Sequence, residues 1–106
     1  IYVSVRALSE AHLSVKIPET SLFPAGFGHL AGGYDAGYYG YLWSRVYAAD
    51  FFTKFREAGV ISSSVGMRYR NEVLTKGSSQ LETKIAKAFL GRKLSNRAFL
   101  EDIGAA

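Results

Sequence analysis

The segment from Pro24 to Tyr41 limits what this chain can fold into, because glycine and tyrosine alternate along it. It holds six of the eleven glycines and four of the seven tyrosines. Gly32 and Gly33 have no Cβ and can adopt positive φ, so they suit a hinge or a close approach of the backbone to a ligand. His29 lies just upstream. We therefore predict that residues 24–41 form a glycine- and tyrosine-rich loop that faces a ligand.

The spacing of three tyrosines supports this interpretation. Tyr34, Tyr38 and Tyr41 follow one another at i, i+4 and i+7, which is one face if the segment is helical. An aromatic row at helical spacing more often fills a core. A buried phenol needs a hydrogen-bond partner, however, and phenylalanine would pack equally well. The aromatic residues of the opposite face are predicted to be core: Tyr39, Trp43 and Tyr47.

The pattern predicts one long helix over residues 35–58, with Asp35 as its N-cap and Gly59 beyond its end. Between Ala36 and Ala49 the only charge is Arg45, and a helix that is apolar nearly all round is buried on most sides. The rest of the chain offers only short elements to cover it. We expect either self-association or cover from further sequence of a parent protein.

The remaining chain also reads as helix, so the predicted fold class is all-α. Residues 1–15 are ambiguous between strand and helix, and we favour helix, with His12 at its end or on its surface. Residues 16–24 are a connection, and 62–104 are short helices. The first of these helices is expected to begin at Ser62–Ser64 and to end at Leu74. The second begins at a capping box, Ser79–Glu82, and ends at Gly91. The third begins at Ser95 and ends at Gly104.

Composition excludes several classes of protein. With 106 residues the chain is at most one domain, and it has no cysteine for a disulfide or a thiolate metal site. The lack of cysteine fits a reducing compartment, so we expect a cytoplasmic protein. No apolar run approaches the roughly 18 residues that span a membrane. The net charge of +4 comes from basic residues interleaved with acidic ones, which does not favour nucleic-acid binding.

The motif F-G-H-L-A-G-G-Y-D-A-G-Y-Y-G-Y-L-W-S, which starts at Phe27, resembles the loop of the thimet oligopeptidase, neurolysin and oligopeptidase A family of zinc metallopeptidases. The similarity reaches Gly104. It continues through Val65–Arg70, Lys76–Ser79, Phe89–Arg92 and Ala98–Leu100. No H-E-x-x-H zinc motif is present. Residues 1–106 thus resemble a C-terminal helical segment of a larger, mainly helical catalytic domain.

The resemblance implies different roles for the loop residues. Tyr41 matches the tyrosine that stabilises the oxyanion of the tetrahedral intermediate, and Tyr34 matches one that contacts the substrate backbone or assists the same oxygen. The positions matching substrate-binding residues are His29, Tyr38, Gly32 and Gly33, the glycines letting the loop close over a peptide.

The resemblance also implies zinc, held by the missing part of the parent protein and by no residue of this chain. The expected partners are peptide substrates and the rest of that protein, with no nucleic acid and no membrane. The isolated chain is then expected to be inactive. The alternative is a non-enzymatic helical module that docks its aromatic helix on a partner. An H-E-x-x-H motif with a downstream glutamate in the preceding sequence would decide for the peptidase.

Overall fold

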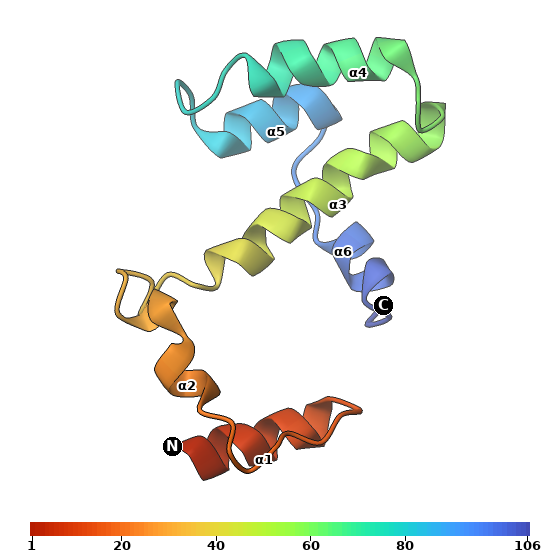
Figure 1. Cartoon of the computed structure of the whole chain (residues 1–106). Coiled ribbons are helices and arrows are strands. Elements are labelled where there is room, and N and C mark those ends of the chain that lie inside the picture. The colour runs from red at the N-terminus through yellow and green to blue at the C-terminus, as the bar shows by residue number, and fades with distance from the viewer. The chain divides into compact units, whose positions relative to one another are not determined.

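The computed structural model describes residues 1–106 and shows two compact units, Ile1–Tyr38 (unit 1) and Tyr39–Ala106 (unit 2). Every regular element is a helix or a helical turn, which confirms the all-α prediction (Figure 1). None of the helices is both long and apolar enough to cross a membrane.

Unit 1 consists of short elements with no core of their own. Its helices are α1 (Tyr2–His12) and α2 (Phe23–Gly26), followed by the 3₁₀ turn η1 (Gly28–Leu30). The predicted N-terminal helix is thus confirmed, with His12 as its last residue. None of the residues from Ile1 to Tyr38 is buried. Local hydrogen bonds and ring contacts therefore define the structure of this unit.

Unit 2 is organised around α3 (Gly40–Ala58). This helix ends where the sequence predicted, with Gly59 at φ 95°, a value that favours glycine. Its start was predicted wrongly at Asp35, because residues 35–39 form turns and Tyr39 occupies the N-cap position. Gly37 and Gly40 explain the difference, since a glycine within a helix costs roughly 1 kcal/mol relative to alanine.

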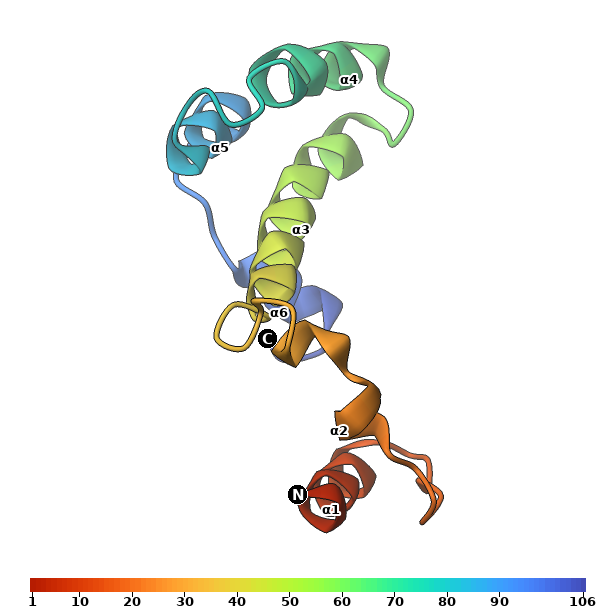
Figure 2. The ribbon, with the colours of Figure 1, turned by 60° about the vertical axis from the view of Figure 1, so that its left-hand side comes forward.

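The short helices of residues 62–104 complete unit 2. They are α4 (Ser63–Tyr69), the π-helical turn η2 (Arg70–Leu74), α5 (Glu82–Leu90) and α6 (Arg97–Asp102). α4 and η2 form one continuous rod that runs antiparallel to α5, and α6 packs on α3 (Figures 1 and 2). Gly91 and Gly104, with φ of 75° and 71°, follow α5 and α6 as predicted.

Two predicted helix starts are corrected. The capping box at Ser79 does not form, because α5 begins at Glu82 with Leu81 as its N-cap residue and no side-chain cap. Asn96, rather than Ser95, occupies the N-cap position of α6. The Ser95 Oγ still accepts a hydrogen bond from the Arg97 N–H at 3.2 Å. Ser62 is the N-cap residue of α4, as predicted, although its side chain makes no capping bond.

The core of unit 2 is centred on Phe89, which is fully buried. Its ring lies 5.3 Å from Phe51 and 5.4 Å from Tyr69, both nearly edge-to-face. Edge-to-face pairs at such distances add about 0.5–1.5 kcal/mol beyond the area they bury. Arg68 closes the edge of this cluster, with its guanidinium 5.1 Å from the Phe89 ring centroid and a hydrogen bond to the Phe89 carbonyl oxygen.

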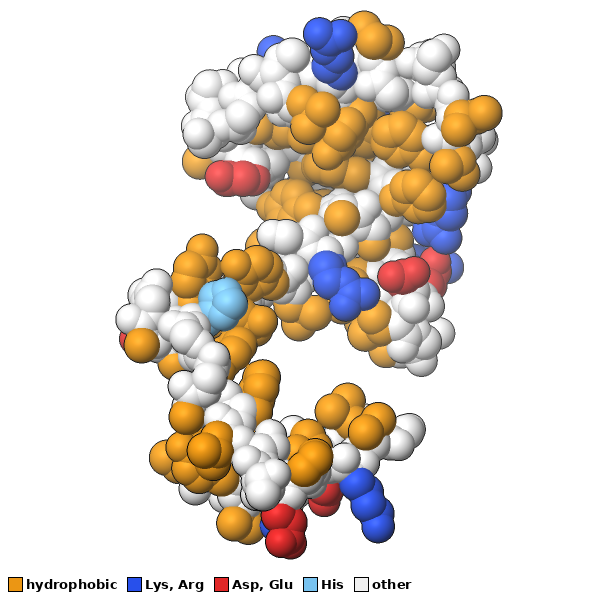
Figure 3. Space-filling view, in the orientation of Figure 1, with side chains coloured by type: hydrophobic (Ala, Val, Ile, Leu, Met, Phe, Trp, Pro, Cys, Tyr) orange, Lys and Arg blue, Asp and Glu red, His pale blue; other side chains and the backbone are white.

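Within this chain helix α3 is buried along one side only, whereas the sequence predicted burial on most sides. Val46 and Asp50 are its only buried residues, and Tyr47 and Phe51 pack on the Phe89 cluster. Hydrophobic side chains remain at the surface of unit 2 (Figure 3). Those of α3 that are about half exposed are Tyr41 and Leu42, both at 54%, Trp43 at 55% and Phe52 at 46%. The expectation that a second copy or further sequence of a parent protein covers this helix stays a prediction.

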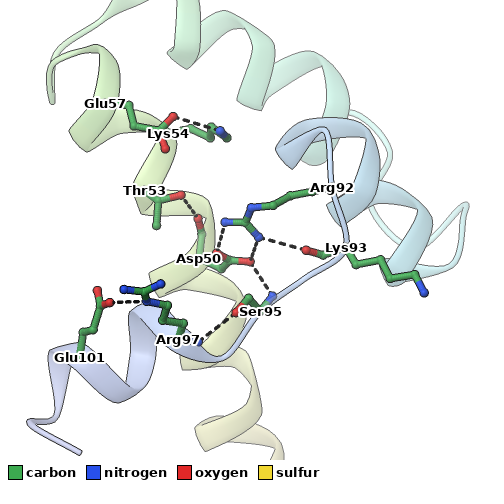
Figure 4. Close-up of polar contacts among 9 residues, drawn as sticks. All are labelled: Asp50, Thr53, Lys54, Glu57, Arg92, Lys93, Ser95, Arg97 and Glu101. Carbon is green, nitrogen blue, oxygen red and sulfur yellow. Dashed lines mark hydrogen bonds and ion pairs between the residues drawn. The ribbon is translucent and has the colours of Figure 1, made fainter. Parts of the chain in front are cut away.

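A buried carboxylate fastens α3 to the segment between α5 and α6. Asp50 is 1% exposed and accepts two hydrogen bonds from the Arg92 guanidinium, at 2.6 and 2.8 Å (Figure 4). The backbone N–H of Ser95 donates a third, at 2.8 Å. The charge is therefore paired and its oxygens are hydrogen-bonded, as a buried carboxylate requires.

These contacts determine the protonation of Asp50. Burial alone raises the pKa of a carboxyl group, but the hydrogen bonds from Arg92 and Ser95 and the Arg92 charge outweigh it. The pKa of Asp50 therefore lies below its ordinary value. Correspondingly, the hydrogen bond to Asp50 raises the pKa of Arg92.

Substituting Arg92 tests how much this pair stabilises unit 2. We expect Arg92→Ala to lower the free energy of unfolding by about 3 kcal/mol, because the Asp50 charge stays buried without its partner. Urea unfolding of the chain measures the change. Arg97→Ala is the matched control, since Arg97 bonds Glu101 at 2.8 Å with 82% of its side chain exposed. That pair should contribute less than about 1 kcal/mol, and equal losses in both variants would contradict the argument.

Acidification should remove the same contribution. Because the pKa of Asp50 is lowered in the folded state, the folded state binds fewer protons than the unfolded state. The stabilisation is complete above the unfolded pKa of about 3.9 and is lost as the pH falls through the lower folded value. We therefore expect the stability difference between wild type and Arg92→Ala to shrink below about pH 4. A difference that is equal at neutral and acidic pH would contradict this assignment.

Candidate functional site

The glycine- and tyrosine-rich segment begins at the short helix α2. Pro24 lies in the first turn, where a missing N–H costs nothing. The Leu22 carbonyl accepts hydrogen bonds from the N–H groups of Ala25 and Gly26. Phe27 then departs from helical geometry at φ −83° and ψ 77°, and η1 follows directly. The chain thus changes direction at Phe27.

A compact turn after η1 brings Tyr34 back to His29. The His29 carbonyl accepts hydrogen bonds from the N–H groups of Gly32 at 3.2 Å and Tyr34 at 3.0 Å. Gly33 has φ 85°, which disfavours any residue with a Cβ. A Cβ on Gly32 would lie 3.2 Å from the Gly28 carbonyl oxygen. The geometry of this turn therefore requires a glycine at position 33 and would crowd a larger residue at position 32.

The turn assembles a cluster of aromatic rings in unit 1. The His29 ring lies 5.7 Å from Tyr34 and 5.0 Å from Tyr38, with interplanar angles of 82° and 66°. Phe27 joins the cluster at 5.2 Å from His29 and 4.8 Å from Tyr38. The structure thus brings together three of the residues that the sequence predicted as site residues. Phe27 is an addition that the sequence reasoning missed, although it stands two positions before His29.

This aromatic cluster is accessible. Tyr34 is 44% and Tyr38 43% exposed. An open pocket of about 460 Å³ adjoins the cluster, lined by Gly26, Phe27, Gly28, His29, Gly32 and Tyr34. The pocket combines backbone groups, an imidazole and a phenol with apolar ring surface. Such a surface can hold a ligand that has both apolar groups and hydrogen-bonding groups.

Tyr41 lies in unit 2, as the second residue of α3, and is 54% exposed. The predicted single helical face for Tyr34, Tyr38 and Tyr41 is wrong, because the first two lie in turns before the helix begins. The opposite face was also predicted wrongly in part. Tyr39 and Trp43 were predicted to be core residues but are 72% and 55% exposed. Tyr47 packs against the core, as predicted.

No metal site is formed by this chain. The structure brings together no group of three or more histidine, aspartate or glutamate side chains that could hold a metal ion. A protein zinc site commonly needs three or four nitrogen, oxygen or sulfur ligands. The residues of this chain therefore do not suffice for one.

Comparison with known proteins agrees with the resemblance that the loop motif shows. The model of Peptidase family M3 matches residues 2–105. The Thimet-like oligopeptidase of Dictyostelium discoideum is 47% identical over 78 residues, which is 74% of this chain and 12% of that protein. Oligopeptidase A of Escherichia coli is 41% identical over 91 residues, 85% of this chain and 13% of that protein. Saccharolysin of Saccharomyces cerevisiae is 42% identical over 80 residues, 74% of this chain and 11% of that protein. The matched part is thus a small fraction of these relatives.

The turn geometry predicts an effect of Gly33→Ala. Because the φ of 85° is unfavourable for alanine, we expect a cost of roughly 1–2 kcal/mol and rearrangement of the turn. Chemical shifts of the Gly32 and Tyr34 amides would report the change. Gly26→Ala is the control, since a Cβ there meets nothing within 4 Å and no positive φ is required. Unchanged amide shifts in Gly33→Ala would contradict the described turn.

Proposed function

Because the chain belongs to Peptidase family M3, we propose that it is part of a zinc-dependent oligopeptidase that hydrolyses short peptides. The observation that carries the proposal is the accessible cluster of His29, Tyr34 and Tyr38, formed on a glycine turn by the motif that resembles the family's substrate loop. In this proposal the chain supplies substrate-binding groups and an oxyanion donor. We also propose the cytoplasm as its compartment, consistent with the absence of cysteine.

Zinc, in this proposal, is bound by other segments of the parent protein. The described residues contain no suitable set of ligands. The isolated chain is therefore proposed to be inactive, and the chemistry of this chain is limited to what its own side chains do. They bind the peptide, orient it and donate hydrogen bonds.

The aromatic cluster suits an extended peptide. Phenols and an imidazole donate and accept hydrogen bonds, and a peptide backbone offers both kinds of partner. The ring faces of the cluster provide apolar surface for peptide side chains. Gly32 and Gly33, which shape the turn, let the backbone approach a substrate closely and give the loop freedom to close over it.

Tyr41 is proposed as the donor to the oxyanion. Attack on a peptide carbonyl places negative charge on its oxygen, and a hydrogen bond aimed at that oxygen grows stronger as the charge develops. A phenol can donate such a bond while remaining neutral. Tyr34 is proposed to contact the substrate backbone or to assist the same oxygen. The exposure of both phenols is consistent with contact to a ligand.

Removing one hydroxyl tests the assignment in the intact protein. We expect Tyr41→Phe to lower kcat by about 100-fold or more with little change in KM, because the lost hydrogen bond forms fully only in the transition state. Tyr34→Phe should slow turnover with a larger effect on KM. Steady-state kinetics on a short quenched fluorescent peptide measure both constants.

The matched control is Tyr39→Phe. Tyr39 is 72% exposed and lies two residues before Tyr41, and its backbone carbonyl still accepts the hydrogen bond from the Trp43 N–H after the change. Both kinetic constants should stay near the wild-type values. If Tyr39→Phe lowers kcat as much as Tyr41→Phe, the proposed role of Tyr41 is wrong.

A second candidate function is a non-enzymatic helical interaction module. The exposed Leu42, Trp43 and Phe52 of α3 favour it, because exposed apolar surface is typical of docking sites. The sequence that precedes this chain in the intact protein distinguishes the two proposals. An H-E-x-x-H motif with a downstream glutamate supports the peptidase. Peptidase activity of the isolated chain with bound zinc would contradict the proposal that other segments of the parent protein bind the zinc.

A further inference from the structure

Phe27 occupies a different environment from the other rings of the loop. It is half-buried, whereas Phe23, His29, Tyr34 and Tyr38 are exposed. It also stands where α2 gives way to η1, at φ −83° and ψ 77°. The side chain is therefore attached at the point where the direction of the backbone is set.

The Phe27 ring contacts two of the proposed substrate-binding side chains at once. It meets Tyr38 edge-to-face, with 4.8 Å between centroids and 78° between planes. It lies 5.2 Å from the His29 ring at 40°. His29 and Tyr38 themselves are 5.0 Å apart. The three rings thus form a closed triangle, in which Phe27 is the member with no polar atom.

Such contacts restrict the orientations of the two polar rings. Exposed side chains in general sample several rotamers, and fixing one of them on binding costs free energy. A ring that is already oriented before the ligand arrives lowers this cost and improves affinity.

We infer that Phe27 is a positioning residue, which holds His29 and Tyr38 in the orientation that binds a peptide substrate. The inference rests on the proposed function of the cluster and assigns a residue that the family resemblance did not. Phe27 has no donor or acceptor on its side chain, so it acts through its two neighbours. Its loss should therefore affect binding of the substrate more than turnover.

The kinetics of Phe27→Leu in the intact protein test this on a short quenched fluorescent peptide. We expect KM to rise roughly three- to tenfold and kcat to stay within about twofold, because the contribution of ring pairs is of this size. Phe27→Tyr keeps the ring and should restore a KM close to that of wild type. Phe23→Leu is the matched control, since Phe23 is 61% exposed and lies outside the triangle of Phe27, His29 and Tyr38. It should leave KM nearly unchanged.

A double-mutant cycle separates positioning from general destabilisation. If Phe27 acts through His29 and Tyr38, Phe27→Leu should raise KM by a smaller factor in the His29→Ala variant than in the wild type, because only the effect through Tyr38 remains. A structural defect would instead add its full effect to that of His29→Ala. Additive changes, or a KM unaltered by Phe27→Leu, would overturn the inference.

Two further readouts keep the test decisive. If Phe27→Leu does not fold, Phe27→Met replaces it, because the flexible methionine side chain fills irregular gaps and has no ring, and the same pattern is expected. If the intact wild-type protein does not cleave the peptide, the proposed function itself fails. If the wild type cleaves it and the cycle is additive, the proposed function stands and only the inference about Phe27 is wrong.

Discussion

The arrangement of unit 2 depends on one buried charge. The Asp50 carboxylate lies in the middle of α3 and accepts hydrogen bonds from Arg92 and from the backbone N–H of Ser95, which both lie in the connection between α5 and α6. A buried carboxylate with fewer partners would be strongly destabilising. The pair therefore selects the arrangement in which both α5 and α6 pack on α3, in addition to what apolar burial contributes.

Local patterns in the sequence predicted the helices well, whereas contacts between residues far apart in the sequence could not be predicted. The ends at Gly59, Gly91 and Gly104 were foreseen because each requires a positive φ that glycine adopts without strain. Helical spacing predicts a start of α3 at Asp35, but Gly37 and Gly40 disfavour a helix there. The pairing of Asp50 with Arg92 spans 42 residues, and no periodicity or capping pattern connects positions so far apart.

The sequence named the candidate site residues but did not predict how they are arranged. The motif identified His29, Tyr34 and Tyr38, and the structure brings their rings into contact. It does so by a turn that closes on the His29 carbonyl rather than by a helical face. The sequence does not indicate a role for Phe27, because a phenylalanine two residues from a histidine has no chemistry of its own. Only the ring distances reveal its contacts.

The contrast between the units explains why the proposed activity belongs to an intact protein. Unit 2 has a buried core around Phe89, whereas unit 1, which carries the aromatic cluster, has no buried residue. Leaving a large apolar side chain such as Trp43 in water forfeits roughly 1.5–3 kcal/mol of burial free energy. The chain spans about an eighth of the length of the curated relatives that it matches. A site made of exposed rings on a coreless segment becomes specific only when further protein surface restricts its motion and excludes water, so the ring contacts within the loop supply only part of the order that binding requires.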